Sequence, residues 1–181
     1  MKRLLFLTGD PSVGKTSLLM KTVDVLRAMG YTVGGMISRE IRGDGGRIGF
    51  EILDLASGRR GWLAHVDQQH GPRLGKYRVN LIDLENVGAK AIVDAAERED
   101  VIVVDEIGPM ELFSLKFKEA VEKAIESRKL VIGVVHRKAE DKLIDAVRAR
   151  GDAEVTTVTF ENRNGLHEAI VKKALEFLEN V

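Results

Sequence analysis

The chain has 181 residues, with 28 Lys and Arg against 28 Asp and Glu, so its formal net charge is zero. This balance excludes the basic excess of a dedicated nucleic-acid-binding protein, and we expect no nucleic-acid partner. The hydrophobic fraction of 44% excludes a disordered chain, and the absence of cysteine excludes thiol catalysis, disulfides and cysteine-ligated zinc. The length predicts a single domain over residues 1–181.

The sequence does not predict membrane insertion or export. No apolar run approaches the roughly 20 residues that cross a bilayer. The apolar stretch at residues 4–7 runs straight into Thr8-Gly9-Asp10-Pro11 without a cleavage site. We therefore expect a cytoplasmic protein with no membrane partner. The sequence is compatible with a monomer and leaves the oligomeric state open.

Strand and helix signals alternate from the start of the chain. Residues 4–7 form a short apolar run ended by a turn signal, which predicts a strand buried on both faces. Residues 17–29 predict a helix, because their apolar residues repeat at helical spacing before Gly30. Residues 32–38 predict a second strand.

Helical periodicity is lost from about residue 38 to 82, which predicts a β-rich insertion into the main fold. The segment reads, in order, as a hairpin over residues 41–55 with its turn at 43–46, a strand over 59–63 and a loop over 70–75.

The alternation resumes after the insertion and continues to the C-terminus. The predicted helices cover residues 84–97, 115–127, 141–149 and 166–178, and the predicted strands cover residues 101–104, 130–135 and 155–160. Strands that alternate with helices imply a mostly parallel sheet with helices on both faces. The predicted fold class is therefore three-layer α/β with a β-rich hairpin insertion.

A phosphate-binding motif lies between the first strand and the first helix. Its residues are Gly9, Asp10, Pro11, Ser12, Val13, Gly14, Lys15 and Thr16, which match G-x-x-x-x-G-K-[ST]. The amides of such a loop form an anion-binding nest at a helix N-terminus. Lys15 is expected to reach the β- and γ-phosphates, and the Thr16 hydroxyl to bind Mg²⁺. The flanking strand and helix favour this interpretation over an ordinary strand–turn–helix connection.

Two acids end the predicted strand at residues 101–104. Asp105 and Glu106 would reach the carboxyl edge of the sheet, where ligands of open α/β sheets bind. We expect Asp105 to hold Mg²⁺ and Glu106 to orient and deprotonate an attacking water. Alone, such a strand end is structural as often as functional, and its pairing with the phosphate motif favours function. A carboxylate beside the attacking water favours hydrolysis over transfer to another acceptor.

Three further residues are candidates for the same site. His136 follows a predicted strand and would either sense the γ-phosphate or cap a loop. Arg137 and Arg163 are candidates for stabilising transition-state charge, with a solvated surface position as the alternative for each. The loop around Arg163 suits either contact with the nucleobase or ribose, or a simple turn.

Charged residues near the predicted hairpin and after Glu106 are less specific. Arg39, Glu40, Arg42 and Arg47 suit either a mobile lid or an exposed charged hairpin. Glu111 lies beside the proposed site, and the sequence assigns it no role.

Together these residues resemble the small thermophilic nucleoside-triphosphatase family, which includes the vertebrate cancer-related nucleoside triphosphatase. The most specific string is Asp105-Glu106-Ile107-Gly108-Pro109-Met110-Glu111-Leu112. Supporting pieces are Arg39-Glu40-Ile41-Arg42, Arg47-Ile48-Gly49-Phe50, Gly75-Lys76-Tyr77, His136 and Glu161-Asn162-Arg163. By position, the resemblance implies that residues 9–16 are the phosphate loop and that Asp105, Glu106, Ile107 and Gly108 belong to the nucleotide-binding site.

The resemblance also implies a RecA-like P-loop domain that hydrolyses several nucleoside triphosphates, such as ATP, GTP, CTP and UTP, to diphosphate and phosphate. It implies dependence on Mg²⁺ and little base selectivity. One departure is Asp10, an acid where a small or neutral residue is expected, which predicts slightly weaker phosphate affinity. The alternatives are a nucleotide or small-molecule kinase, and a nucleotide-gated or RNA-associated binding module.

Overall fold

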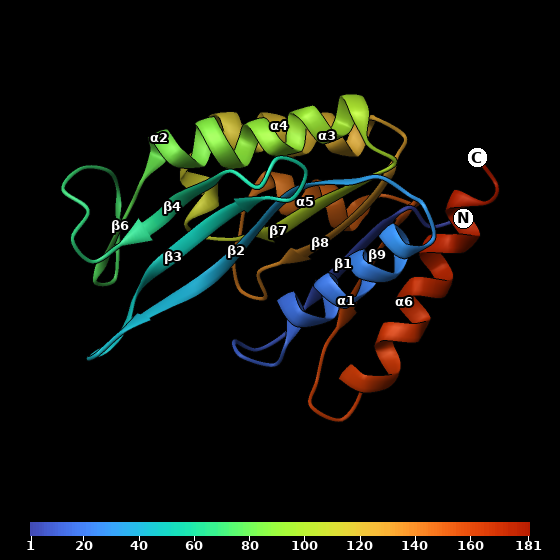
Figure 1. Cartoon of the computed structure of the whole chain (residues 1–181), viewed down its shortest axis with the longest axis horizontal. Coiled ribbons are helices and arrows are strands. Elements are labelled where there is room, and N and C mark those ends of the chain that lie inside the picture. The colour runs from blue at the N-terminus through green and yellow to red at the C-terminus, as the bar shows by residue number, and fades with distance from the viewer.

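One continuous sheet of nine strands runs through the computed structural model, which describes residues 1–181 (Figure 1). The strands are β1 (Leu4–Thr8), β2 (Val33–Gly43), β3 (Gly46–Asp54), β4 (Arg60–His65), β5 (Arg73–Leu74), β6 (Tyr77–Val79), β7 (Val101–Ile107), β8 (Leu130–Val135) and β9 (Ala153–Thr157). Their spatial order is β5-β6-β4-β3-β2-β7-β8-β1-β9. β8 therefore separates the strand before the phosphate motif from the strand that ends in acids.

Helices cover both faces of this sheet. They are α1 (Lys15–Ala28), α2 (Leu81–Asp83), the π-helical turn η1 (Leu84–Ala89), α3 (Lys90–Arg98), the 3₁₀ turn η2 (Glu111–Phe113), α4 (Leu115–Glu126), α5 (Lys142–Ala149) and α6 (Arg163–Leu178). α1 and α6 pack together on one face, and α3, α4 and α5 cover the other (Figure 1). This arrangement confirms the three-layer α/β fold class. None of the helices is long and apolar enough to span a bilayer.

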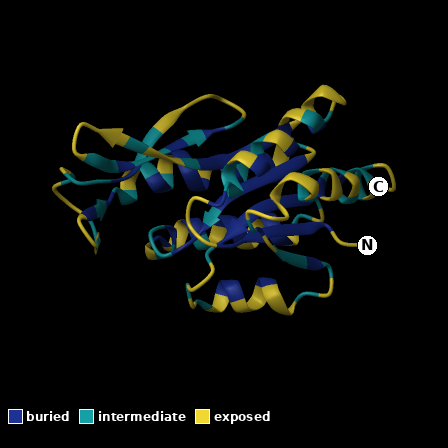
Figure 2. Ribbon diagram, turned by 90° about the horizontal axis from the view of Figure 1, so that it is seen from below, coloured by how far each residue is buried: buried dark blue, intermediate teal, exposed yellow.

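The apolar strands follow from burial on both faces. Along β1, Leu4 and Phe6 pack into the core beneath α3, α4 and α5, whereas Leu5 and Leu7 pack beneath α1 and α6. Successive strand residues point to opposite faces, so a strand covered on both sides needs an unbroken apolar run. The central strands are accordingly buried along their length (Figure 2).

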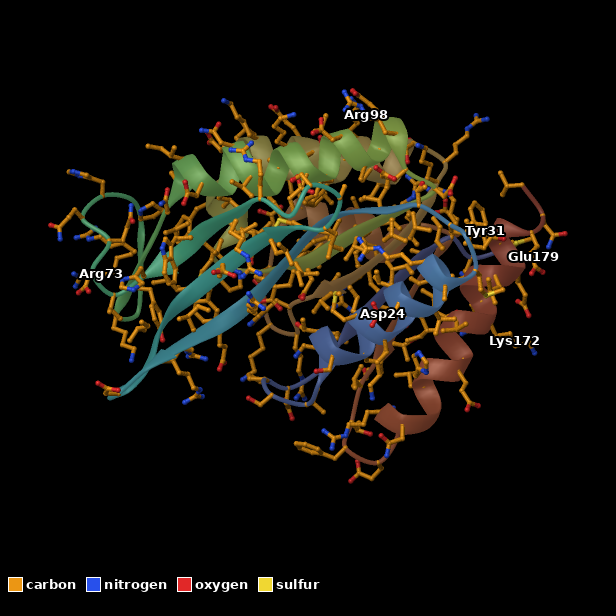
Figure 3. All side chains as sticks on the ribbon, viewed as in Figure 1. Asp24, Tyr31, Arg73, Arg98, Lys172 and Glu179 are labelled. Atoms are coloured by element: carbon orange, nitrogen blue, oxygen red, sulfur yellow. The ribbon has the colours of Figure 1, made fainter.

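Charged side chains occupy the outer surfaces instead. Arg98, at the end of α3, and Lys172 and Glu179, on or just after α6, project away from the sheet (Figure 3).

The parallel strands give the sheet one functional edge. β2, β7, β8, β1 and β9 run parallel, so their carboxyl ends lie along the same edge. The phosphate motif follows β1, the two acids end β7, and His136 follows β8. Residues far apart in the sequence thus meet at the position where open α/β sheets bind ligands.

The predicted insertion extends the same sheet. Val33 to Met36 pair with β7, and from Met36 onward β2 pairs antiparallel with β3 as far as Gly43. This second half of β2 runs past the end of the pairing with β7, and β3, β4, β6 and β5 continue the sheet from it. The insertion is therefore a continuation of the central sheet.

The loop predicted at residues 70–75 is partly wrong, because Arg73 and Leu74 form β5. They pair with Arg78 and Tyr77 across a tight turn at Gly75. A two-residue strand is too short to produce the alternation that marks strands in a sequence.

The last strand and helix are also displaced from their predicted bounds. The strand predicted at residues 155–160 is β9 over 153–157, because its pairing with β1 ends where Thr8 lies opposite Thr157. Thr159 and Asn162 then hydrogen-bond to each other in a turn, so the helix predicted from residue 166 begins at Arg163. The helix predicted from residue 84 begins earlier, at Leu81, where the Asn80 side chain accepts a bond from the Asp83 amide.

Gly35 allows β2 and β7 to lie side by side. Its φ is +108°, and a Cβ there would stand 2.1 Å from the carbonyl oxygen of Val103. We expect Gly35→Ala to lower the free energy of unfolding by about 2 kcal/mol or more, because strain at positive φ adds to the clash. Urea unfolding measures this. Gly45→Ala is the matched control, since a Cβ on Gly45 meets nothing within 4 Å. Equal stability of the two variants would contradict the prediction.

Candidate active site

A cavity of about 720 Å³ opens at the carboxyl edge of the parallel strands. The phosphate motif contributes Gly9, Asp10, Pro11, Ser12, Gly14, Lys15 and Thr16 to its lining. The segments after β7 and β8 contribute Asp105, Glu106, Glu111, His136 and Arg137, and the β2–β3 hairpin contributes Arg39, Glu40, Arg47 and Phe50. The cavity thus brings together the predicted phosphate loop, the two predicted acids and His136.

The phosphate loop leaves the start of α1 free to bind an anion. Gly14 is the N-cap residue in a left-handed conformation with φ of 99°, and no side chain caps the helix or places an acid in its first turn. Ser12 is also left-handed, with φ of 64°. Uncapped amides and the positive end of the helix dipole favour a negative ligand such as phosphate.

Lys15 supplies a cation inside this loop. Its Nζ donates hydrogen bonds to the carbonyl oxygens of Gly9 and Asp10, at 2.8 Å each. Burial lowers the pKa of Lys15, and the nearby charges of Glu106, Asp105 and Asp10 oppose that shift. The ammonium is therefore held over the loop by weak acceptors that a phosphate oxygen can replace.

Thr16 and Asp105 meet at the base of the cavity. Thr16 Oγ1 donates a hydrogen bond of 2.8 Å to Asp105 Oδ2. Burial raises the pKa of Asp105 to about 7, and the hydrogen bond from Thr16 opposes the shift. A hydroxyl and a carboxylate are the hard oxygen ligands that suit Mg²⁺. The chain has no group of three or more His, Asp or Glu that would hold a metal by itself, so these two residues fit a metal whose other ligands are phosphate and water.

Glu106 joins Asp105 in the cavity through an irregularity in β7. The pairing with β8 shifts register between Asp105 and Ile107, so Glu106 is the extra residue. Regular alternation would turn adjacent side chains to opposite faces, and a bulge removes this restriction. The peptide bond between Asp105 and Glu106 is cis. Burial raises the pKa of Glu106, while the neighbouring His136 and Lys15 side chains oppose the shift.

His136 caps a loop and lines the cavity at the same time. Its Nδ1 accepts hydrogen bonds from the amides of Lys138 and Ala139, at 3.2 and 3.0 Å. An acceptor nitrogen carries no hydrogen, so the neutral ring bears its proton on Nε2. His136 therefore caps a loop, and its contact with the γ-phosphate stays a prediction.

Arg137 is the partner of Asp10, the unexpected acid in the phosphate loop. Its guanidinium forms an ion pair with Asp10, and both side chains are more than half exposed. The pair links the phosphate loop to the segment after β8 at the mouth of the cavity.

Four predicted site residues do not line the cavity. Val13 and Ile107 are buried in the two halves of the core. Gly108 lies between Glu106 and Glu111. The guanidinium of Arg163 lies 5.2 Å from the Phe160 ring, and its Nη1 is 3.5 Å from the carbonyl oxygen of Val13. Arg163 therefore supports the phosphate loop from outside the cavity.

The side chains of the β2–β3 hairpin reach the cavity because the hairpin pairs with strands that are distant in the sequence. Arg47 donates hydrogen bonds of 2.8 Å to the Tyr77 hydroxyl and to Glu40, and its guanidinium lies 5.0 Å from the Phe50 ring centroid. Arg42 does not line the cavity. The charged segment near residues 39–47 is visible in the sequence, but its place in the lining of the cavity depends on how far β2 extends.

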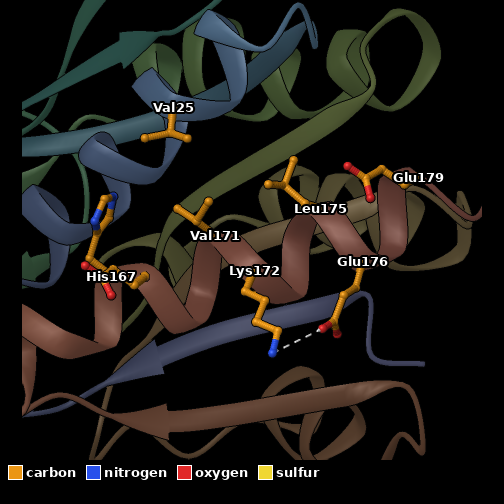
Figure 4. Close-up of a pocket in the computed structure, with 8 residues that line it drawn as sticks. Val25, His167, Val171, Lys172, Leu175, Glu176 and Glu179 are labelled. Atoms are coloured by element: carbon orange, nitrogen blue, oxygen red, sulfur yellow. Dashed lines mark ion pairs between the residues drawn. The ribbon is translucent and has the colours of Figure 1, made fainter.

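A second cavity of about 440 Å³ lies between α1 and α6 (Figure 4). Val25, Val171 and Leu175 form its apolar part, and charged side chains surround it, including the ion pair of Lys172 and Glu176. No backbone loop or group of converging polar atoms lines it. The candidate catalytic and binding residues therefore lie in the larger cavity.

A family model described as NTPase matches residues 4–171, nearly the whole length of the chain. The chain belongs to this NTPase family. A nucleoside-triphosphatase THEP1 of Thermofilum pendens is 44% identical over 92% of both chains. That of Methanosarcina acetivorans is 47% identical over 94% of this chain and 96% of its own.

Solved structures of the NTPase family share the fold. A human cancer-related nucleoside triphosphatase has a TM-score of 0.81 at 37% identity, covering 96% of this chain and 98% of its own. The THEP1 of Aquifex aeolicus has a TM-score of 0.80 at 28% identity, covering 96% of this chain and 99% of its own. These matches confirm the resemblance on which the sequence analysis relied.

Asp10 places a negative charge where an NTPase would hold phosphates. We expect Asp10→Asn to tighten nucleoside-triphosphate binding by about two- to fivefold, because the change removes repulsion and releases Arg137, and exposed charges contribute about 1 kcal/mol or less. Titration calorimetry at low and high salt measures this, and salt should reduce the gain. Asp44→Asn, in the exposed hairpin turn, is the control. Weaker binding by Asp10→Asn would show that the ion pair with Arg137 supports the loop.

Proposed function

We propose that this protein hydrolyses nucleoside triphosphates to diphosphate and phosphate, that it depends on Mg²⁺, and that it discriminates little between bases. The observation that carries the proposal is the position of Glu106, a largely buried carboxylate in the cavity that the phosphate loop lines. The names of the relatives, nucleoside-triphosphatases, support the same reaction class.

The chain's own residues would hold and orient the triphosphate. The loop amides and Lys15 bind the β- and γ-phosphates, with Lys15 exchanging the carbonyls of Gly9 and Asp10 for phosphate oxygens. Thr16 and Asp105 would hold Mg²⁺, which neutralises part of the phosphate charge when bound. Catalysis of this kind depends on positioning and electrostatic stabilisation.

Glu106 orients the attacking water and takes its proton. Burial raises the pKa of this carboxylate, which makes it a better base than an exposed glutamate. His136 lines the same cavity, and its Nε2 proton would serve as a donor to the γ-phosphate or the water. Arg137, once released from Asp10, stabilises charge that develops on the phosphate.

Weak base selectivity is supported by the loop after β9. Phe160 is 64% exposed, and the Arg163 guanidinium lies 5.2 Å from its ring. Arg163 Nη1 in turn lies 3.5 Å from the carbonyl oxygen of Val13 in the phosphate loop. An aromatic or guanidinium surface stacks on any base, because every base has a π-face. We infer that the base rests on this surface and is not selected by hydrogen bonds to its edges.

Glu106→Gln should keep nucleotide binding and lower kcat by about 100-fold or more, because the amide cannot accept the proton of water. Phosphate release from ATP, GTP, CTP and UTP with Mg²⁺, without an added acceptor, measures this. Lys15→Ala is the control that should lose both binding and release. Hydrolysis by Glu106→Gln at the parental rate would make the base assignment wrong. Binding without release by the parent chain would favour a phosphoryl transferase.

Phe160→Ala should raise KM for all four triphosphates by a similar factor of about 5 to 100, since stacking on an aromatic side chain contributes about 1–3 kcal/mol per base. Steady-state kinetics with each nucleotide measures the change. Met29→Ala removes another exposed apolar side chain, just after the end of α1 farthest from the phosphate loop, and is the control. A KM change for one base alone would contradict the inference of unselective stacking.

A further inference from the structure

The insertion forms a wall of the main cavity that the reaction as described does not use. The side chains of this hairpin wall come from β2, β3, β4 and β5, and they are Arg39, Glu40, Arg47, Phe50, Leu63 and Leu74. The rest of the lining comes mainly from the phosphate loop and from the segments after β7 and β8. The hairpin wall therefore differs from the phosphate-binding part of the cavity in both its origin and its chemistry.

The order of the strands separates the hairpin wall from the proposed position of the base. β1 leads into the phosphate loop, and the loop after β9 carries Phe160, on which we place the base. β9 lies on one side of β1, whereas β8, β7, β2 and β3 follow one another on the other side (Figure 1). Neither Phe160 nor Arg163 lines the cavity. A nucleotide whose base rests at Phe160 therefore extends away from the hairpin wall and leaves this wall for a second molecule.

The Arg47 guanidinium is held in place and still has hydrogen-bond donors to offer. Its Nε donates to the Tyr77 hydroxyl and its Nη1 to Glu40, at 2.8 Å each, and the group lies 5.0 Å from the Phe50 ring centroid. Phe50 in turn packs edge-on against Tyr77, with the ring centroids 5.3 Å apart. A guanidinium has five N–H donors, and the Arg47 side chain is 39% exposed, so its remaining donors are open to a ligand.

The insertion carries an excess of positive charge around this wall. Four guanidinium groups share two carboxylates, since Arg39 and Arg60 pair with Glu51, and Arg42 and Arg47 pair with Glu40. Such a cluster favours an anionic ligand. The planar fork of a guanidinium matches the paired oxygens of a phosphate group.

The same wall offers apolar surface beside the guanidinium. Phe50, Leu63 and Leu74 line the cavity together with Arg47. Binding sites for small organic molecules combine apolar and aromatic side chains with a few polar groups that fix the orientation of the ligand. The hairpin wall therefore suits a molecule that has both a ring and a phosphate group.

We propose that the hairpin wall binds a second molecule, a ring-bearing phosphate monoester of the nucleoside-monophosphate kind, beside the bound triphosphate. Its phosphate accepts hydrogen bonds from Arg47, and its ring packs against Phe50 and Leu74. The inference rests on the proposed position of the triphosphate and does not require its hydrolysis.

Equilibrium dialysis with AMP tests the proposal on protein saturated with Mg²⁺ and a non-hydrolysable ATP analogue. The analogue fills the phosphate loop, so AMP should bind as a single additional molecule per chain while the analogue stays bound. Ribose 5-phosphate lacks the base and adenosine lacks the phosphate. Each should bind about tenfold more weakly than AMP or worse, because the wall contacts both parts. This comparison of probes needs no variant.

Two substitutions separate the contributions of charge and apolar surface. Arg47→Gln should weaken AMP and ribose 5-phosphate by about tenfold or more and leave adenosine unchanged, because it removes the cation that holds the phosphate. Leu74→Ala should weaken AMP and adenosine by about threefold or more and leave ribose 5-phosphate unchanged. Arg42→Gln is the matched control. Arg42 lies on the same hairpin and also pairs with Glu40, but it does not line the cavity. Its substitution should change all three affinities by less than about twofold.

The outcomes distinguish this inference from the proposed function. Displacement of the analogue by AMP overturns the inference, because both would then occupy the phosphate loop, and absence of AMP binding overturns it as well. Equal losses in Arg47→Gln and Arg42→Gln also overturn it, since general charge would then explain the binding. A chain that holds AMP with the analogue but releases no phosphate from ATP loses the proposed hydrolysis and keeps the inference. A chain that does not bind the analogue overturns both.

Discussion

The hydrogen bond from Thr16 to Asp105 connects the two halves of the site. It joins the first turn of α1 to the end of β7, across the position of β8 in the sheet. Because α1 and β7 belong to rigid parts of the fold, the distance between the phosphate loop and the acids is set by the packing of the sheet. A site in which catalysis depends on positioning requires such a fixed distance. The order in which β8 lies between β1 and β7 also places His136 between the two motifs.

The length of β2 determines what covers this site. Its first residues pair with β7 within the parallel sheet, and its second half continues past the edge as a hairpin with β3. The hairpin places Arg47 and Phe50 in the lining of the cavity, where Tyr77 and Glu40 hold the Arg47 guanidinium. Arg47 meets Glu40 and Tyr77 because β2, β3, β4 and β6 pair with one another in the insertion. The hairpin therefore forms one side of the cavity, and hydrogen bonds and aromatic packing hold its Arg47 and Phe50 side chains in place.

Local patterns predicted the parts of the molecule that depend on neighbouring residues. The alternation of strands and helices gave the three-layer fold, and the motif at residues 9–16 gave the phosphate loop, because each requires residue types at fixed spacing. The sequence could not give β5, which is too short for a pattern, or the end of β9, which is set by pairing with β1. The ion pair of Arg137 with Asp10 could not be predicted either, because 127 residues separate the partners in the sequence. Glu111 was visible as a residue, but its position near Glu106 depends on the turn that follows β7.

The buried acids of the cavity must be balanced before a triphosphate can bind there. Asp105, Glu106 and Glu111 are all largely buried, and burial raises the pKa of each. A triphosphate adds several negative charges to the same space, so the site binds it only if its own acids carry little net charge or are matched by cations. Lys15 and the uncapped amides of α1 supply part of that compensation. Asp105 is engaged by Thr16, and we therefore propose Glu106 as the carboxylate of this cavity that accepts the proton of the attacking water.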